Sequence, residues 1–252
     1  MLLRYTHTFS FIKNIMHIFL RRSITFLRDS IKWAVIFFFI SSFLAIIALR
    51  WIPVYYSPLM FIRCVQQQLA GEPLKLAHHW VPLEDISDHL DNAVIASEDN
   101  RFPTHHGFDF NAIMDAAEER LNGERFRGGS TITQQTAKNV FLWPSSSWVR
   151  KGFEAYFTVL IDVFWSKERQ MEVYLNTIEM GDGIYGAQAV ARAHFQKDAK
   201  DLTRGECALI AASLPNPLRF NSGNPSSYMF KRRKRILRLM RMLPDFPQKR
   251  IE

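Results

Sequence analysis

The feature that most constrains this chain is an uncharged apolar run near its beginning. Residues 33–49 read WAVIFFFISSFLAIIAL, with Lys32 and Arg50 at the two ends of the run. A helix needs about 17–25 apolar residues to cross a bilayer, and flanking cations can reach back to the interface. A cleavable signal peptide usually has a shorter apolar core of about 7–15 residues. We therefore predict an uncleaved transmembrane helix over residues 33–50.

Charge predicts which side of the membrane each part occupies. Before the apolar run there are six cations and a single acid, Asp29. The positive-inside rule then places residues 1–32 in the cytoplasm as a basic arm and residues 51–252 outside it. We expect a single-pass protein of the cell inner (cytoplasmic) membrane with a periplasmic domain. The net charge of +8 favours an anionic partner, and outside the cytoplasm that partner is lipid or a lipid-linked phosphate, not nucleic acid.

The rest of the chain reads as mostly helical. Residues 51–84 look like a connecting segment interrupted by four prolines, and residues 85–243 look like one folded domain. We found no alternating strand pattern, so the expected fold class is all-α, or mainly α. Helix starts and further helical runs are expected as follows: after Asp91 or Asn92, after Asp109 (to Gly123), after Ser130 or Thr131 (to Pro144), at 148–165, after Ser166 (to Gly181), and at 186–195, 203–214 and 227–243.

The two cysteines give no sign of a redox or zinc site. Cys64 and Cys207 are far apart in the sequence and form no CxxC pair. Cys207 lies in an apolar run, where a buried and inert thiol is expected. Whether the two pair as a disulfide is left open by the sequence.

One short segment gathers acids and bases after a hydrophobic run. Glu98 and Asp99 are adjacent, and Arg101, His105 and His106 follow closely. One interpretation is a helix end with solvated charges. The other is a catalytic carboxylate held near cations that bind an anionic substrate.

Two further segments are polar in a way that suits a sugar or phosphate ligand. Residues 128–139 read GGSTITQQTAKN, with a glycine-rich turn at a helix start and Lys138 one turn after Gln134. The order of a P-loop is missing, and an ordinary capped helix start is the alternative. Residues 150–154 read RKGFE, which in isolation fits a surface ion pair.

Taken in order, these motifs resemble glycosyltransferase family 51, the glycosyltransferase module of penicillin-binding proteins. The matching patterns are ED-x-x-F-x-x-H-x-G at 98–107, GGSTITQQ-x-x-KN at 128–139, RK-x-x-E at 150–154 and K-x-x-x-x-E-x-YLN at 167–176. Segments 183–195 and 209–221 extend the likeness to about residues 85–240, although His194 stands where the family usually has an aromatic residue. Since no transpeptidase-sized domain follows, the chain resembles the monofunctional biosynthetic peptidoglycan transglycosylases.

The resemblance implies a fold, a reaction and roles for single residues. The fold is a lysozyme-like helical domain with a small membrane-dipping subdomain. The reaction polymerises lipid II into β-1,4-linked glycan with inversion and releases undecaprenyl diphosphate. Glu98 matches the general base and Glu154 the second catalytic glutamate. The substrate-binding residues that it implies are Asp99, Ser130, Gln134, Lys138, Asn139, Arg150 and Lys151. Asp99 can instead support local structure or tune Glu98, and His105 can be a structural hydrogen-bonder.

Other expectations concern the surroundings of the site. Phe141, Leu142 and Trp143 should touch lipid at the membrane-dipping subdomain, with core packing as the alternative. The basic run 231–241 is either a solvated face or attracted to lipid headgroups. We expect no obligatory cofactor and no metal-ligand cluster, with Mg²⁺ or Mn²⁺ as an optional aid. Expected partners are lipid II, the growing glycan, membrane lipids and cell-division or penicillin-binding proteins. A membrane-anchored lytic glycosidase and a non-catalytic cell-wall scaffold are the alternative functions.

Overall fold

The computed structural model describes residues 2–121 and 129–246 and divides into two units, residues 1–48 and 49–252. The first unit is formed by α1 (Leu2–Leu49), a single continuous helix. Its portion Arg21–Leu49 is long and apolar enough to cross a membrane, as the uncharged run predicts.

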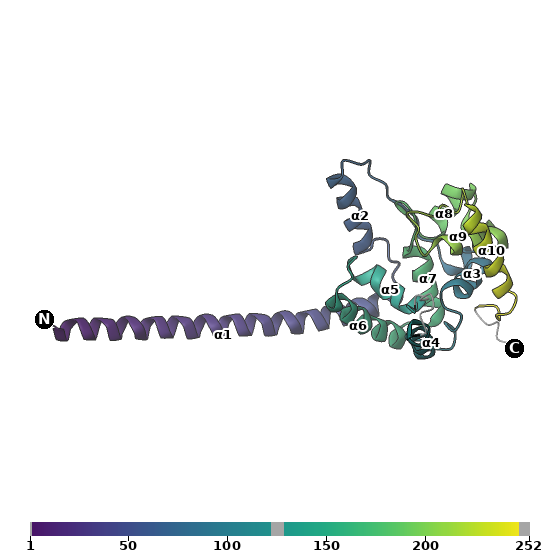
Figure 1. Ribbon diagram of the computed structural model, residues 1–252. Coiled ribbons are helices and arrows are strands. Elements are labelled where there is room, and N and C mark those ends of the chain that lie inside the picture. The colour runs from purple at the N-terminus through teal and green to yellow at the C-terminus, as the bar shows by residue number, and fades with distance from the viewer. Residues whose placement is uncertain (1, 122–128, 247–252) are drawn as a thin grey trace. The chain divides into compact units, whose positions relative to one another are not determined.

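The second unit is mainly helical, which confirms the expected fold class (Figure 1). Its helices are α2 (Pro58–Leu69), η1 (Leu83–Asp85), α3 (Asp88–Glu98), α4 (Phe110–Leu121), α5 (Ile132–Phe141), α6 (Trp148–Phe164), α7 (Lys167–Thr177), α8 (Ala187–Phe195), η2 (Ala199–Asp201), α9 (Arg204–Ser213) and α10 (Ser227–Leu239).

A small sheet is present that the sequence did not predict. The strands β1 (Ala77–His78), β2 (Glu179–Gly181) and β3 (Ile184–Tyr185) are ordered β1-β3-β2, with β1 parallel and β2 antiparallel to β3. Strands this short are below the length at which alternation can be recognised. The turn between β2 and β3 requires Gly183, which has a φ of +70° and where a Cβ atom would lie 2.5 Å from the carbonyl oxygen of Lys75.

Most predicted helix starts are confirmed by the hydrogen bonds that cap them. Oδ1 of Asp109 accepts from the amide of Ala112 at 2.9 Å, and the hydroxyls of Thr131 and Ser166 cap α5 and α7. The predicted end of α4 at Gly123 lies outside the described residues. Local polar side chains therefore fix where these helices begin.

Several boundaries differ from the expectation, and α10 for example ends at Leu239 and not at residue 243. Helix α3 begins after Ser87 and not after Asp91 or Asn92, because both of those side chains are buried on the helix. Helix α7 ends at Thr177, and the residues that were expected to extend it form β2. The segment that was expected to be a connection contains helix α2. This helix begins at Pro58 after the capping residue Ser57, because proline is tolerated in the first turn of a helix.

The packing of the second unit brings two groups of helices together. Helix α9 packs against both α3 and α10, and α5 packs against α6 and α7 (Figure 1). The hydrophobic core runs from α3 through α7 and α8 to α9 and α10, and contains Phe102, Tyr174 and Cys207. Cys207 is buried and Cys64 half-buried, and both are free thiols, so they do not pair. The end of α3 meets the start of α5 at the segment that carries Glu98.

Candidate active site

Glu98 is the last residue of α3, where its carboxylate meets α5. The side chain is half-buried, and Oε1 accepts from the hydroxyl of Ser97 at 3.2 Å. Oε2 accepts from the amide nitrogen of Gln135 at 3.3 Å. Burial raises the pKa of Glu98 above its ordinary value, although Gln135, Ser97 and the charge of Arg232 act in the opposite direction. A carboxylate with a raised pKa is a stronger base, which suits the removal of a proton from a hydroxyl group.

The neighbouring carboxylate, Asp99, is occupied inside the protein. Its two oxygens lie 3.0 and 2.9 Å from Nε2 of His105, and Oδ2 also accepts from the backbone amide of Ile132 at 2.9 Å. Asp99 is 5% exposed. These contacts favour the structural alternative for Asp99 and His105, because together they hold the loop after α3 against the start of α5.

The polar residues at the start of α5 divide into structural and accessible groups. Thr131 and Gln134 form a capping box: the amide of Gln134 donates to the Thr131 hydroxyl at 3.1 Å, and the amide of Thr131 donates to Oε1 of Gln134 at 3.0 Å. Gln134 and Asn139 are buried, whereas Ser130 is exposed at the entrance to the helix. The side-chain amide oxygen of Gln134 is therefore used to cap the helix start, whereas Ser130 is accessible to a ligand.

The residue that reaches Glu98 from α5 is Gln135, which the sequence analysis did not select. Its side-chain nitrogen donates to Glu98, and its side-chain oxygen Oε1 accepts from the hydroxyl of Tyr174 at 3.2 Å. Tyr174 is fully buried, and burial raises its pKa well above the ordinary value. The hydroxyl therefore remains a donor, and it fixes Gln135 with its amide group turned toward Glu98. The only local signal was the position of Gln135 within the polar motif.

A cluster of cations lies on α6 around a buried carboxylate. Nη1 of Arg150 donates to Oε2 of Glu154 at 2.5 Å, and the ammonium of Lys151 pairs with Oε1. Glu154 is 3% exposed and Arg150 is 9% exposed, whereas the Lys151 side chain is 42% exposed. Both oxygens of Glu154 are thus engaged by cations, which favours an orienting role for this residue over a role in proton transfer.

Lys138 connects Glu98 with this cluster. Its side chain is exposed, yet the surrounding protein removes part of the ammonium's hydration and lowers its pKa. Glu154 and Glu98 oppose the shift, while Arg150 and Lys151 add to it. Because Lys138 interacts with all four charges, the predicted base and the predicted cations belong to one site. Such a site can hold an anion close to a basic carboxylate.

The expected lipid contact is only partly compatible with the structure. Leu142 is 3% exposed and packs in the interior, so lipid contact is wrong for this residue. Phe141 stacks on Phe157 with ring centroids 4.5 Å apart. Trp143 is exposed, as are Trp148 and Val149, so these apolar side chains face solvent.

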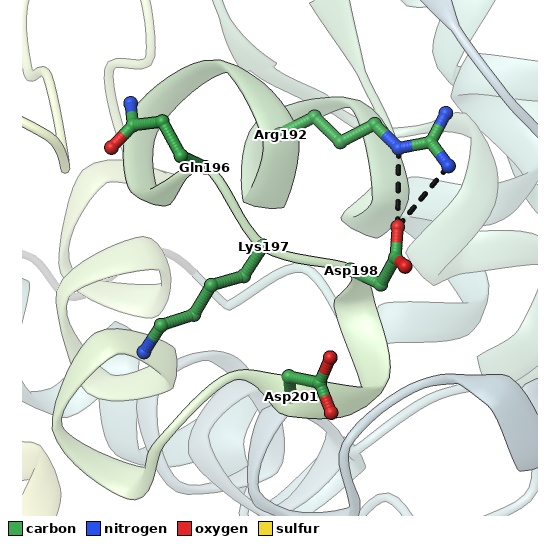
Figure 2. Close-up of a pocket in the computed structure, with 5 residues that line it drawn as sticks. All are labelled: Arg192, Gln196, Lys197, Asp198 and Asp201. Atoms are coloured by element: carbon green, nitrogen blue, oxygen red, sulfur yellow. Dashed lines mark hydrogen bonds and ion pairs between the residues drawn. The ribbon is translucent and has the colours of Figure 1, made fainter.

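Two of the hollows among the described residues differ in their relation to the site. One of about 480 Å³ is lined by Arg192, Gln196, Lys197, Asp198 and Asp201 (Figure 2). Three of its charged side chains are already paired, since Arg192 donates twice to Asp198 and Lys197 binds Glu206. The other, about 390 Å³, lies along the loop from Arg101 to Asn111 that follows Glu98. Only the second adjoins the candidate site.

No group of three or more His, Cys, Asp or Glu side chains that could hold a metal ion occurs among the described residues.

His194, the position that departs from the family pattern, lies on α8, where its Nδ1 is 2.7 Å from the hydroxyl of Ser222. This contact joins α8 to the loop before α10.

Comparison with known proteins agrees with this geometry. The family model described as "Transglycosylase" matches residues 66–241. A "Biosynthetic peptidoglycan transglycosylase" of Bacteroides thetaiotaomicron is 63% identical over 212 residues, covering 84% of this chain and 86% of the relative. Proteins of the same description from Bdellovibrio bacteriovorus (88% of each chain covered) and Pseudomonas entomophila (83% of this chain, 89% of the relative) are each 49% identical. With the motif residues gathered at one site and this likeness over most of its length, the chain belongs to the transglycosylase family.

Proposed function

We propose that the chain is a peptidoglycan glycosyltransferase that polymerises lipid II into β-1,4-linked glycan strands with inversion, releasing undecaprenyl diphosphate. The observation that carries the proposal is the single site in which Glu98, with a raised pKa, lies within electrostatic range of Lys138. A base and a cation are the two things that this reaction needs, because a hydroxyl must lose a proton and a diphosphate must depart. The likeness to biosynthetic peptidoglycan transglycosylases supports the choice of substrate.

In this proposal Glu98 activates the acceptor. The 4-hydroxyl of the incoming lipid II gives its proton to the Glu98 carboxylate as its oxygen attacks C1 of the donor sugar. The bond between C1 and the diphosphate oxygen breaks, and its electron pair leaves with the diphosphate. Gln135 and Ser97 hold the carboxylate in place for this step.

The cations stabilise the leaving group. Negative charge grows on the diphosphate as the bond breaks, so fixed positive charge is worth more in the transition state than in the ground state. Lys138, Arg150 and Lys151 serve this purpose, and Glu154 keeps the last two oriented. Ser130, which is exposed, is assigned to the sugar or phosphate oxygens, whereas Asn139 is 5% exposed and is left out of this assignment.

The proposal requires no obligatory cofactor. An Mg²⁺ or Mn²⁺ ion would be held by the oxygens of the substrate diphosphate, because the described residues offer no cluster of metal-binding groups. Addition of EDTA to the assay measures how much such an ion contributes.

The direct test is an assay of the purified full chain with labelled lipid II. A polymerase converts it to long glycan and releases undecaprenyl diphosphate in proportion to the bonds formed. A lytic glycosidase would instead shorten preformed glycan, and a scaffold would do neither. Either of these last results would overturn the proposal.

Replacing Lys138 by Met is expected to lower the turnover number by about a hundredfold. Met preserves much of the length of the side chain but removes the charge that faces the leaving group. The measurement is the initial rate of polymerisation at saturating lipid II. Lys234→Met, an exposed lysine of α10, is the matched control and should retain the parent rate. Equal rates for Lys138→Met and the parent would remove Lys138 from the mechanism.

We also propose that the basic arm, residues 1–32, lies in the cytoplasm and that the catalytic domain lies in the periplasm at the inner membrane. The excess of cations before the apolar run supports this orientation. Proteinase K added to spheroplasts should degrade the catalytic domain and leave an N-terminal tag intact. Loss of the tag with protection of the domain would reverse the orientation. Membrane lipids, and the cell-division or penicillin-binding proteins, remain proposed partners.

A further inference from the structure

The short segment that follows α10 contacts the loop that carries the site. After α10 the chain turns through Met240 and reaches Asp245 and Phe246, which lie beyond the matched family region 66–241. Phe246 is only 5% exposed and belongs to the hydrophobic core. Since Phe246 lies beyond the end of α10, helical hydrogen bonds do not hold it, and contacts with other parts of the chain must keep it in the core.

The holding residue is Asn92 on α3. Its side-chain nitrogen donates to Oδ1 of Asp245 at 3.1 Å, and its side-chain oxygen accepts from the backbone amide of Phe246 at 3.0 Å. Asn92 is itself 8% exposed. Because one amide group makes both bonds, it fixes the segment in position and in direction against the helix that ends at Glu98.

The ring of Phe246 supports the loop directly. It meets Phe102 edge to face, with centroids 5.7 Å apart, and Phe102 is fully buried. On its other sides Phe102 contacts the ring of His105, with centroids 6.2 Å apart, and lies beneath the ammonium of Lys167 at 4.9 Å. Aromatic contacts of this kind have preferred geometry, so removing one ring leaves the next one free to move.

From Phe102 the contacts lead to the site. His105 binds Asp99, and Asp99 accepts from the amide of Ile132 at the start of α5. The same helix carries Gln135, which donates to Glu98. The segment after α10 thus reaches the proposed base through a continuous series of buried and partly buried contacts.

We propose that Phe246, held by Asn92 and Asp245, is a positioning residue for glycosyl transfer: it fixes the loop of Phe102 and His105, and through Asp99 the start of α5, so that Gln135 stays on Glu98. Phe246 contacts no substrate in this assignment. The inference rests on the proposed function and assigns that function a further residue outside the motifs.

The test compares Phe246→Ala with the parent as full-length proteins at a temperature where both are folded, using initial rates against lipid II concentration and pH. We expect the turnover number to fall about tenfold while KM stays within about twofold, since remote misplacement affects the chemical step. We also expect the acidic limb of the pH profile to move to lower pH, because a loosened loop admits water to Glu98. Simple loss of stability would not move that limb.

Two variants and a control make the test decisive. Phe246→Leu, which refills most of the volume, should recover most of the rate. Asp245→Ala removes one hydrogen bond to Asn92 and leaves no cavity in the core. It should lower the turnover number about threefold with KM little changed, and it replaces Phe246→Ala in the test if that variant does not fold. Met242→Ala, an exposed residue of the same segment, should match the parent.

The outcomes separate this inference from the proposed function. A parent that does not polymerise lipid II overturns the proposed function and this inference with it. An active parent whose rate and pH profile are equalled by Phe246→Ala, or by Asp245→Ala where the first does not fold, overturns this inference alone. An equal loss in Met242→Ala also overturns it.

Discussion

Glu98→Gln is expected to lower the turnover number for glycan polymerisation by about 10³, because an amide cannot accept the proton of the acceptor hydroxyl. Gln has nearly the shape of Glu, so the bonds from Ser97 and Gln135 can be replaced with little change in packing. The measurement is the initial rate with labelled lipid II at saturation. Glu84→Gln, an exposed glutamate on η1, is the matched control and should behave as the parent does.

The pH dependence of the parent checks the same role independently. Burial raises the pKa of Glu98, and a base acts only after it has lost its proton. The value of kcat/KM should therefore rise with pH through a limb that lies above the ordinary pKa of 4.5 for a glutamate. Glu98→Gln should lose this limb along with the rate. A variant that keeps more than about a tenth of the parent rate would contradict the assignment, since general base catalysis contributes at least about a hundredfold.

Sequence reasoning succeeded where the structural cause is local. The capping box of Thr131 and Gln134 and the ion pairs of Arg150 and Lys151 with Glu154 join residues three or four apart, a spacing that can be read from the chain. The membrane-type helix could also be predicted, because its apolar residues are consecutive in the sequence.

The same reasoning was less informative where a residue's partner is distant. Gln134 was assigned to the substrate, but its side chain caps α5. The sequence does not distinguish a polar side chain that bonds locally from one that bonds a ligand. Gln135 and Arg232 approach Ser97 and Glu98 from distant parts of the chain, and only the tertiary fold, including the packing of α10 against α3, brings them there. The assignments of substrate contacts stay predictions.

Asp91→Asn is expected to stabilise the folded chain at alkaline pH. Asp91 is 3% exposed on α3, and burial raises the pKa of its carboxyl group from 3.8 to about 8, with Asp88 and Asp245 adding to the shift. The backbone amide of Asn92 donates to it at 2.7 Å and acts in the opposite direction. On α9, Cys207 is close enough for the Asp91 charge to contribute to its own raised pKa. No cation among the described residues forms an ion pair with Asp91.

The direction of the effect follows from proton binding. Unfolded, Asp91 loses its proton near pH 3.8; folded, it keeps the proton to about pH 8. Between these values the folded state binds more protons, so stability falls as pH rises, and above about pH 8 the loss is complete. At 1.36 kcal/mol per pH unit, the three units from pH 5 to pH 8 correspond to an upper limit of about 4 kcal/mol. Asn is neutral throughout and avoids this cost.

The measurement is the thermal midpoint of the full chain in detergent at pH 5 and pH 8. The midpoint of Asp91→Asn should exceed that of the parent by at least about 5 °C at pH 8 and by clearly less at pH 5, since about 1 kcal/mol corresponds to 2–4 °C in a domain of this size. Glu84→Gln, an exposed carboxylate on η1 that does not contribute to the shift at Asp91, is the control and should change the midpoint little at either pH. Equal gains at both pH values would show that Asn acts through packing and not through charge.

Other groups titrate in the same range without confusing the comparison. Burial raises the pKa of Glu98 and Glu179, which also makes stability fall with rising pH, whereas burial lowers the pKa of His78 and His194, which costs stability as pH falls below 6.5. These four groups are present in parent and variant alike, and none of them contributes to the shift at Asp91. The difference between the two proteins therefore reports the protonation of Asp91 itself, and a difference that does not grow between pH 5 and pH 8 would mean that Asp91 does not titrate in this range and that Asn acts through packing.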